Sequence, residues 1–320
     1  TPSPTPTPSP TPSPTPVTTE QLQTLTVAQQ LDTLDLLTAE QQVNLIDDLV
    51  KADVDASAAL IQGLITKNAD DAAEIVASME SGEVATIFAS EKLDAAAAAA
   101  VLGSGNMSAE KAAAILQKET LGADRAASIL SSDEISTLKA AQILNSVNID
   151  ADKGAAILAS INLDADKGAE LLGSAQLDAG KAADILNSNQ IDATKAASIL
   201  DQPALTATRS ATILGEVEKT KAGAILEAVS TTKVEGIVAN MPEAKLVERL
   251  PEMSAGKLRS LSPGVLFDNL PSVPTEAIAR EFAPVVDPSC APPAVTQVSQ
   301  ELIVYEVCDT AELAWAKMVS

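Results

Sequence analysis

Pairs of adjacent large apolar residues recur along the middle of the chain at a constant interval of fourteen residues. Alanine and polar residues fill most positions between them. Ten consecutive pairs keep this interval: Ile87-Phe88, Val101-Leu102, Ile115-Leu116, Ile129-Leu130, Ile143-Leu144, Ile157-Leu158, Leu171-Leu172, Ile185-Leu186, Ile199-Leu200 and Ile213-Leu214. Such self-similarity indicates a repeat protein, in which each unit packs against its neighbours.

One polar position in each unit decides between a long coiled coil and a series of short helices. Fourteen residues are two heptads, so a continuous coiled coil is one interpretation. However, eight of nine units carry Asp, Ser or Thr, the preferred N-caps of helices, seven residues after the start of a pair. The nine positions are Asp94, Ser108, Gly122, Ser136, Asp150, Asp164, Asp178, Asp192 and Thr206. Repeated caps predict repeated helices of roughly 9–10 residues, joined by turns of about four.

The apolar positions of a unit fall on one face of its predicted helix. After Asp150, residues Ala151, Gly154, Ala155 and Leu158 follow the i, i+3, i+4, i+7 pattern. A methyl group at the position of Ala155 lets neighbouring helices approach closely, and a larger side chain should overpack the core. Nine units have alanine there: Ala99, Ala113, Ala127, Ala141, Ala155, Ala169, Ala183, Ala197 and Ala211. We therefore expect an all-α fold, an α-solenoid (superhelix) of short single-helix repeats.

The units of the form acid-x-Lys-Ala-Ala-x-Ile-Leu resemble known helical repeats. Four carry the pattern most closely, namely residues 150–158, 164–172, 178–186 and 192–200, and residues 20–250 carry it more loosely. They look like the N-terminal superhelical domain of the MgtE magnesium channels and the helical repeats of the flagellar switch protein FliG. The resemblance implies an α-superhelix and assigns no catalytic residue. This chain differs in lacking a channel segment, and MgtE units are typically richer in Glu and Pro.

Composition separates a stalk from the predicted solenoid. Residues 1–17 form a linker in which Pro alternates with Ser or Thr, a pattern typical of extended, O-glycosylated spacers. Residues 18–282 form the solenoid, which is regular over 87–214 and has an irregular, Pro-interrupted cap over 242–282. Candidate O-glycosylation sites in the stalk are Thr5, Thr7, Thr11 and Thr15.

A second change of composition follows the solenoid. Residues 283–294 form another Pro-rich linker, and residues 295–320 form a small C-terminal segment. Its β-branched and aromatic residues predict a strand at 301–307, and Asp309 could cap a helix over 309–319. Because this segment is too small to fold alone, we expect it to be the start of a truncated domain.

The net charge of the chain limits the kinds of molecule that it could bind. The net charge is −23, and the chain has no histidine. Nucleic acids and anionic lipids are bound by clustered Lys and Arg, so this composition argues against both. No apolar run reaches the ~18–20 residues that span a bilayer. We expect protein partners or self-association, with no nucleic acid and no membrane insertion.

The stretch from Asn148 to Gly154 resembles a calcium loop. Asn148, Asp150 and Asp152 alternate as calcium ligands do in an EF-hand, but that loop needs glycine at its sixth position and glutamate at its twelfth. Lys153 and Ala159 occupy these positions. Helix capping by Asp150 and a favourable dipole interaction of Asp152 explain the pattern, so we predict no metal site and no cofactor.

A row of cations occupies the third position of eight predicted helices. A positive charge there opposes the helix dipole, so helix propensity does not explain it. One interpretation is a ladder in which each cation contacts an acid on a neighbouring unit, which the acidic composition favours. The other is a stripe that binds an anionic partner or a second copy. The cation row is Lys111, Arg125, Lys139, Lys153, Lys167, Lys181, Lys195 and Arg209.

The sequence has no pattern typical of a catalytic site. It has no histidine, no G-x-S-x-G motif and no phosphate-binding glycine loop, and Cys290 and Cys308 are a candidate disulfide rather than nucleophiles. We therefore expect no enzyme activity but a structural or adhesive repeat scaffold, secreted or at the surface of a prokaryotic cell. The alternative is an MgtE-like regulatory domain that responds to divalent cations. The shortage of aromatic residues disfavours a carbohydrate binder.

Overall fold

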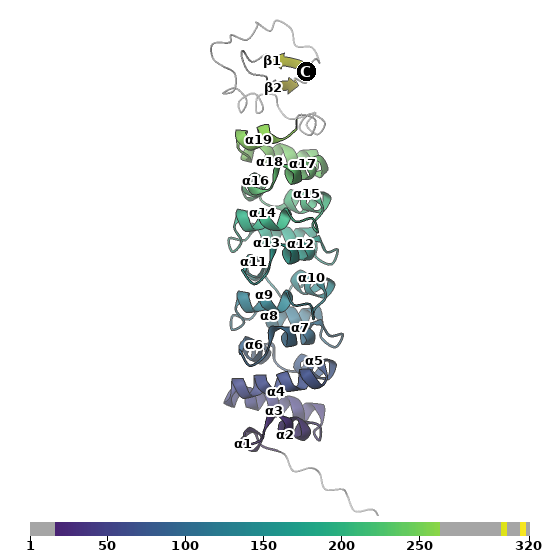
Figure 1. Cartoon of the computed structure of the whole chain (residues 1–320), viewed down its shortest axis with the longest axis vertical. Coiled ribbons are helices and arrows are strands. Elements are labelled where there is room, and N and C mark those ends of the chain that lie inside the picture. Colours follow the sequence, from purple (N-terminus) through teal and green to yellow (C-terminus); the bar gives the residue numbers. More distant parts are fainter. Residues whose placement is uncertain (1–16, 263–301, 306–313, 318–320) are drawn as a thin grey trace, which may run out of the picture.

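The structure is a computed structural model that describes residues 17–262, 302–305 and 314–317. Its helices are stacked in one elongated column, so the predicted α-solenoid is confirmed (Figure 1). The helices are α1 Thr19–Gln23, α2 Val27–Leu34, α3 Ala39–Ala52, α4 Val54–Lys67, α5 Ala69–Ser78, α6 Ser81–Ala89, α7 Ala95–Gly103, α8 Ala109–Leu116, α9 Ala123–Leu130, α10 Thr137–Asn145, α11 Ala151–Ala159, α12 Ala165–Gly173, α13 Ala179–Asn187, α14 Ala193–Leu200, α15 Ala207–Glu216, α16 Lys219–Ala228, α17 Thr231–Asn240, α18 Glu243–Arg249 and α19 Ala255–Ser260, with a 3₁₀-helix η1 at Leu250–Glu252.

The helices of the regular region begin where the sequence places them. All nine predicted cap positions are the N-cap residues of α7 to α15. Asp94 and Asp178 make no side-chain capping bond, and Gly122 has no side chain to make one. Six side chains accept the N–H of the third helical residue: Ser108, Ser136, Asp150, Asp164, Asp192 and Thr206.

Each regular helix packs against the helices two places before and after it in the chain. Helix α11, for example, lies against α9 and α13. The approach is close, because a Cβ added to Gly154 of α11 would lie 3.0 Å from Ile185 of α13. Side-chain hydrogen bonds also connect helices three places apart: Gln117 Nε2, at the end of α8, donates to Asp150 Oδ2, before α11, and Gln117 Oε1 accepts the backbone N–H of Asp150. One turn of the superhelix therefore takes between two and three helices. In Figure 1, α6, α11 and α16 recur along one edge of the column and α5, α10 and α15 along the other.

A single continuous core runs through the column. The Ile-Leu pair of each regular unit is fully buried, as are the apolar residues before the caps, such as Ile149 and Leu163. The nine alanines at the position of Ala155 are at most 2% exposed. This burial confirms the predicted apolar face of the helices. Among the described residues, no helix is long and apolar enough to cross a membrane.

The C-terminal residues differ in part from the prediction. Strand β1, Leu302–Tyr305, confirms the strand expected at 301–307. The helix expected over 309–319 is wrong for Ala314–Lys317, which forms strand β2 and pairs with β1 in antiparallel register, Val304 opposite Trp315. Pairing gives the backbone groups of both short segments partners, whereas a helix of this length is marginal on its own. The predicted linker at 283–294 lies outside the described residues.

Candidate functional site: the cation row

The cation row lies inside the stack rather than along a free surface. Its eight side chains are all partly buried, and each belongs to the third residue of a helix. Lys153 of α11 illustrates the arrangement: its Nζ donates to the carbonyl oxygens of Leu121 at 2.5 Å and Lys118 at 3.2 Å. Both acceptors lie in the turn that joins α8 to α9. The ladder of cations and acids is therefore wrong for Lys153, because its hydrogen-bond acceptors are backbone carbonyl groups.

The same contact recurs along the row. In seven of the eight cases the side chain donates to the carbonyl of the residue just before the N-cap of the helix two places earlier. The pairs are Lys111 to Met79, Arg125 to Leu93, Lys139 to Met107, Lys153 to Leu121, Lys181 to Ile149, Lys195 to Leu163 and Arg209 to Leu177. Carbonyl groups at the ends of helices and in the turns after them lack partners within their own helix. A cation at this place supplies donors and interacts favourably with the negative end of the helix three places earlier, which the turn follows.

The two arginines of the row reach further than the lysines. The Nε of Arg125 donates to the carbonyl of Phe88 at 2.8 Å, and the Nε of Arg209 donates to that of Leu172 at 3.0 Å. Phe88 and Leu172 lie in the last turns of α6 and α12. Because a guanidinium carries five donors in a planar fork, one arginine covers both the helix end and the turn that follows.

Partial burial lowers the pKa of some members of the cation row. Desolvation lowers the pKa of Lys153, and the carboxylates of Asp150 and Glu119 partly offset this effect. Desolvation likewise lowers the pKa of Arg125, with Asp94 acting in the opposite direction. The cations have therefore been partly withdrawn from water, and carbonyl groups and nearby acids compensate them.

Lys167 is the exception in the row. Its Nζ lies 3.6 Å from the carboxylate of Glu170 and donates to Thr137 Oγ1 at 3.3 Å. Glu170 is on the same helix, so this pair does not form the expected ladder between units either. Within the described residues, Lys167 makes no hydrogen bond to a backbone carbonyl, which makes it a natural comparison for Lys153.

The row continues beyond the eight residues that a fixed interval identifies. The helices that follow begin at intervals of twelve, and counting from each N-cap, rather than from the previous lysine, finds three further members. Lys221 donates to Ile191 at 2.6 Å, Lys233 to Leu205 and Lys257 to Val229.

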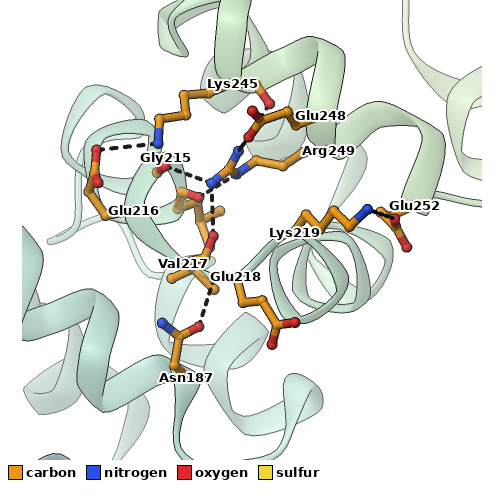
Figure 2. A network of polar contacts seen from close by, with 11 residues as sticks. Asn187, Gly215, Glu216, Val217, Glu218, Lys219, Lys245, Glu248, Arg249 and Glu252 are labelled. Carbon is orange, nitrogen blue, oxygen red and sulfur yellow. Dashed lines mark hydrogen bonds and ion pairs between the residues drawn. The ribbon is translucent and has the colours of Figure 1, made fainter.

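In α18 an arginine replaces the lysine of the row. Lys245 occupies the third position but lies 3.8 Å from the carboxylate of Glu216 instead. Arg249, one turn later, is only 3% exposed, and its guanidinium points at the end of α15 (Figure 2). Three of its acceptors are the carbonyl groups of Leu214 (2.8 Å), Gly215 (2.6 Å) and Val217 (2.8 Å). Its Nη1 also donates to Glu248 Oε2 at 3.0 Å and to the carbonyl of Lys245 at 3.3 Å.

A second set of contacts joins the turns to helix starts. Ser160 Oγ donates to Asp124 Oδ1 at 2.7 Å, and Asn162 Nδ2 donates to the carbonyl oxygen of Asp124 at 3.1 Å. Ser188 makes the same contact with Asp152 at 2.6 Å. The second helical residue is therefore acidic in several units because it accepts a hydrogen bond from a later turn, in addition to its favourable position on the dipole.

These contacts account for the side chains of the apparent calcium loop. Asp150 Oδ1 accepts the backbone N–H of Lys153 at 2.7 Å, as capping predicts, and its Oδ2 accepts from Gln117 at 2.6 Å. Asn148 donates to the carbonyl of Glu110 at 3.0 Å. Over residues 17–262, no group of three acidic or sulfur ligands has a geometry that could hold a metal ion.

The other predicted site residues are Cys290, Cys308, Thr5, Thr7, Thr11 and Thr15, and they lie outside the described residues. Comparisons with protein-family models, curated proteins and solved structures found no match to this chain. The resemblance to MgtE and FliG repeats therefore stays a prediction. Partner binding by the cation row also stays a prediction, although seven of its eight members direct donors to the chain's own backbone.

Proposed function

We propose that the chain is a non-catalytic repeat scaffold, structural or adhesive, that makes contacts with other proteins or with further copies of itself. The observation that carries this proposal is the way the units are joined. Each regular helix shares a core with the helices two places away, and side chains of a later unit contact the start of an earlier helix, as Lys153 and Ser160 do at α9. Such a stack presents a long surface of fixed shape, which suits protein partners.

Charge and composition support a location outside the cell. The net charge of −23 keeps such a column soluble and disfavours binding to nucleic acid or anionic lipid. The Pro-alternating tract over residues 1–17 is typical of a glycosylated spacer that holds a domain away from a surface. The proposed scaffold is therefore secreted or displayed on a prokaryotic cell.

Light scattering coupled to size exclusion tests the scaffold directly. The full chain is run over a hundredfold range of concentration, with EDTA and with excess calcium or magnesium. We expect an elongated particle whose association rises with concentration and is indifferent to metal. A monomer at every concentration would restrict the proposal to contacts with other proteins. A particle that becomes compact only with metal would overturn it in favour of the MgtE-like regulatory alternative.

A triple variant then tests the cation row as a partner surface. Lys153, Lys167 and Lys181 are replaced by alanine, and association and thermal unfolding are measured together. Lost association with unchanged unfolding would support the stripe. Unchanged association with lower stability is the result expected from the carbonyl contacts.

A further inference from the structure

The cation row does not extend to the N-terminal helices. Counting from the N-cap Glu80, the third residue of α6 is Glu83, and the corresponding residue of α7 is Ala97. The first member of the row is therefore Lys111 of α8. The change at α6 is a reversal of charge at a position that is basic in most later helices.

Glu83 meets a second acid instead of a backbone carbonyl. Its partner is Asp47 of α3, the helix three places earlier, and their carboxyl groups lie within hydrogen-bonding reach. Asp47 Oδ1 and Glu83 Oε2 are both buried, and neither has a hydrogen-bond partner within residues 17–262. Two ionised carboxylates cannot donate to one another, whereas one shared proton gives both groups a partner.

The nearby positive charge of Lys51 offsets the negative charge of the Asp47–Glu83 pair only in part. Lys51, one turn after Asp47 on α3, places its Nζ 3.8 Å from Glu83 Oε1 but also 3.6 Å from Asp48. Desolvation, followed by the hydrogen bond and the charge of Glu83, raises the pKa of Asp47 to about 6, with Asp48 acting in the same direction and Lys51 against it. Helices α1, α4 and α5 pack against α3, and α4 and α8 pack against α6, but within the described chain no charged group of these helices contributes to the shift of the Asp47 pKa.

We propose that Asp47 and Glu83 form a proton-dependent joint, which holds α3 against α6 when the two carboxyl groups share a proton and loosens that contact when both are ionised. Helix α4 also packs against α6 and α7, and α5 packs against α7, so this pH-sensitive contact is one of several that join the N-terminal helices to the regular solenoid. The proposal concerns this contact alone and does not depend on the scaffold function.

The sign of the effect follows from the direction of the shift. The folded state binds the proton of Asp47 more tightly than the unfolded state, because the pKa is raised on folding. The stabilisation is therefore largest at low pH and is lost as the pH rises to about 6. Ordinary surface carboxylates in favourable contacts show the opposite trend, so the joint has to be isolated by variants.

Hydrogen exchange of the full chain, read by mass spectrometry at about pH 5 and pH 7.5 and corrected for intrinsic rates, is the test. We expect amides of α3 and α6 to open about tenfold more readily at the higher pH, whereas those of α11 to α13 change little. In Asp47→Asn and in Glu83→Gln the ratio for α3 and α6 should fall close to one. The matched control Glu74→Gln removes an exposed carboxylate of α5 and should leave the wild-type ratio unchanged.

Two results would overturn the joint. One is an equal pH ratio for α3 and α6 in wild type and in both variants, and the other is a pH effect spread evenly over α1 to α19. Far-UV circular dichroism establishes that each variant is folded. Because either carboxyl group can be replaced, the test survives if one variant fails to fold.

Discussion

The regular units and the two ends of the solenoid cover the same backbone groups with different side chains. In the regular region a Lys or Arg reaches back from a helix two places further along, as Lys153 does to Leu121. At the N-terminal end, neutral amides act between consecutive helices: Gln30 donates to the carbonyl of Leu22 at 2.9 Å, and Gln42 donates to that of Leu34 at 2.8 Å. Toward the C-terminal end Arg249 supplies several donors from one buried side chain, beside the lysine contact that Lys257 makes with Val229.

The difference shows that the fold needs a donor at the helix ends rather than a particular residue. A long flexible cation is suited to the regular region, where the acceptor lies on a non-consecutive unit and acids such as Asp150 lie nearby. A shorter amide is sufficient where the acceptor is on the preceding helix. It brings no charge into a region that, over residues 17–50, contains six acids and no Lys or Arg.

The largest effect is expected at Arg249. In Arg249→Met the apolar stem remains, but the carbonyl groups of α15 lose several donors at a nearly buried site. We expect the free energy of unfolding to fall by about 3 kcal/mol, measured by urea denaturation. The control is Lys219→Met, which removes the ion pair that Lys219 forms with Glu252 at 3.8 Å (Figure 2). This variant should lower the free energy of unfolding by less than about 0.5 kcal/mol. Equal losses in the two variants would contradict the role of Arg249.

A smaller effect separates two members of the row. Lys153→Met leaves the carbonyl groups of Leu121 and Lys118 without their donor, and we expect a loss of about 1–2 kcal/mol. Lys167→Met removes a contact with Glu170 and Thr137 only, and we expect a loss below about 0.5 kcal/mol. Thermal unfolding of both variants at low and high salt checks the comparison. If Lys167→Met were as destabilising as Lys153→Met, hydrogen bonds to backbone carbonyl groups would not explain how the cation row stabilises the fold.

Local chemistry explains what could be predicted from the sequence. An N-cap acts within its own helix, so residues such as Asp150 and Thr206 fix where helices begin, and the spacing of Ala155 and Leu158 fixes which face is buried. These features require no knowledge of how units are arranged. The fourteen-residue interval was therefore sufficient to predict the solenoid.

Contacts between units could not be predicted in the same way. Lys153 and Leu121 are 32 positions apart, and their contact depends on how many helices make one turn of the superhelix. The contact between Asp47 and Glu83 also depends on the number of helices in one turn, so the sequence pattern does not identify these two acids as a pair. Lys221 was missed for a simpler reason, because the interval changes from fourteen to twelve while the position within the helix does not.

The smallest effect tests whether the cap and the interior of a unit are independent. Gly122 is the N-cap of α9, with φ −56° and ψ 156°, and a Cβ added there meets nothing within 4 Å. In Gly122→Asp the new carboxylate can accept the N–H of Arg125 and lies at the positive end of the helix, so we expect a gain of about 0.5 kcal/mol. Gly154→Ala adds a Cβ 3.0 Å from Ile185, and we expect overpacking to cost about 1 kcal/mol. Thermal unfolding should thus move in opposite directions for the two glycines. A loss of stability in both variants would mean that neighbouring units constrain the N-cap position as tightly as they constrain the core.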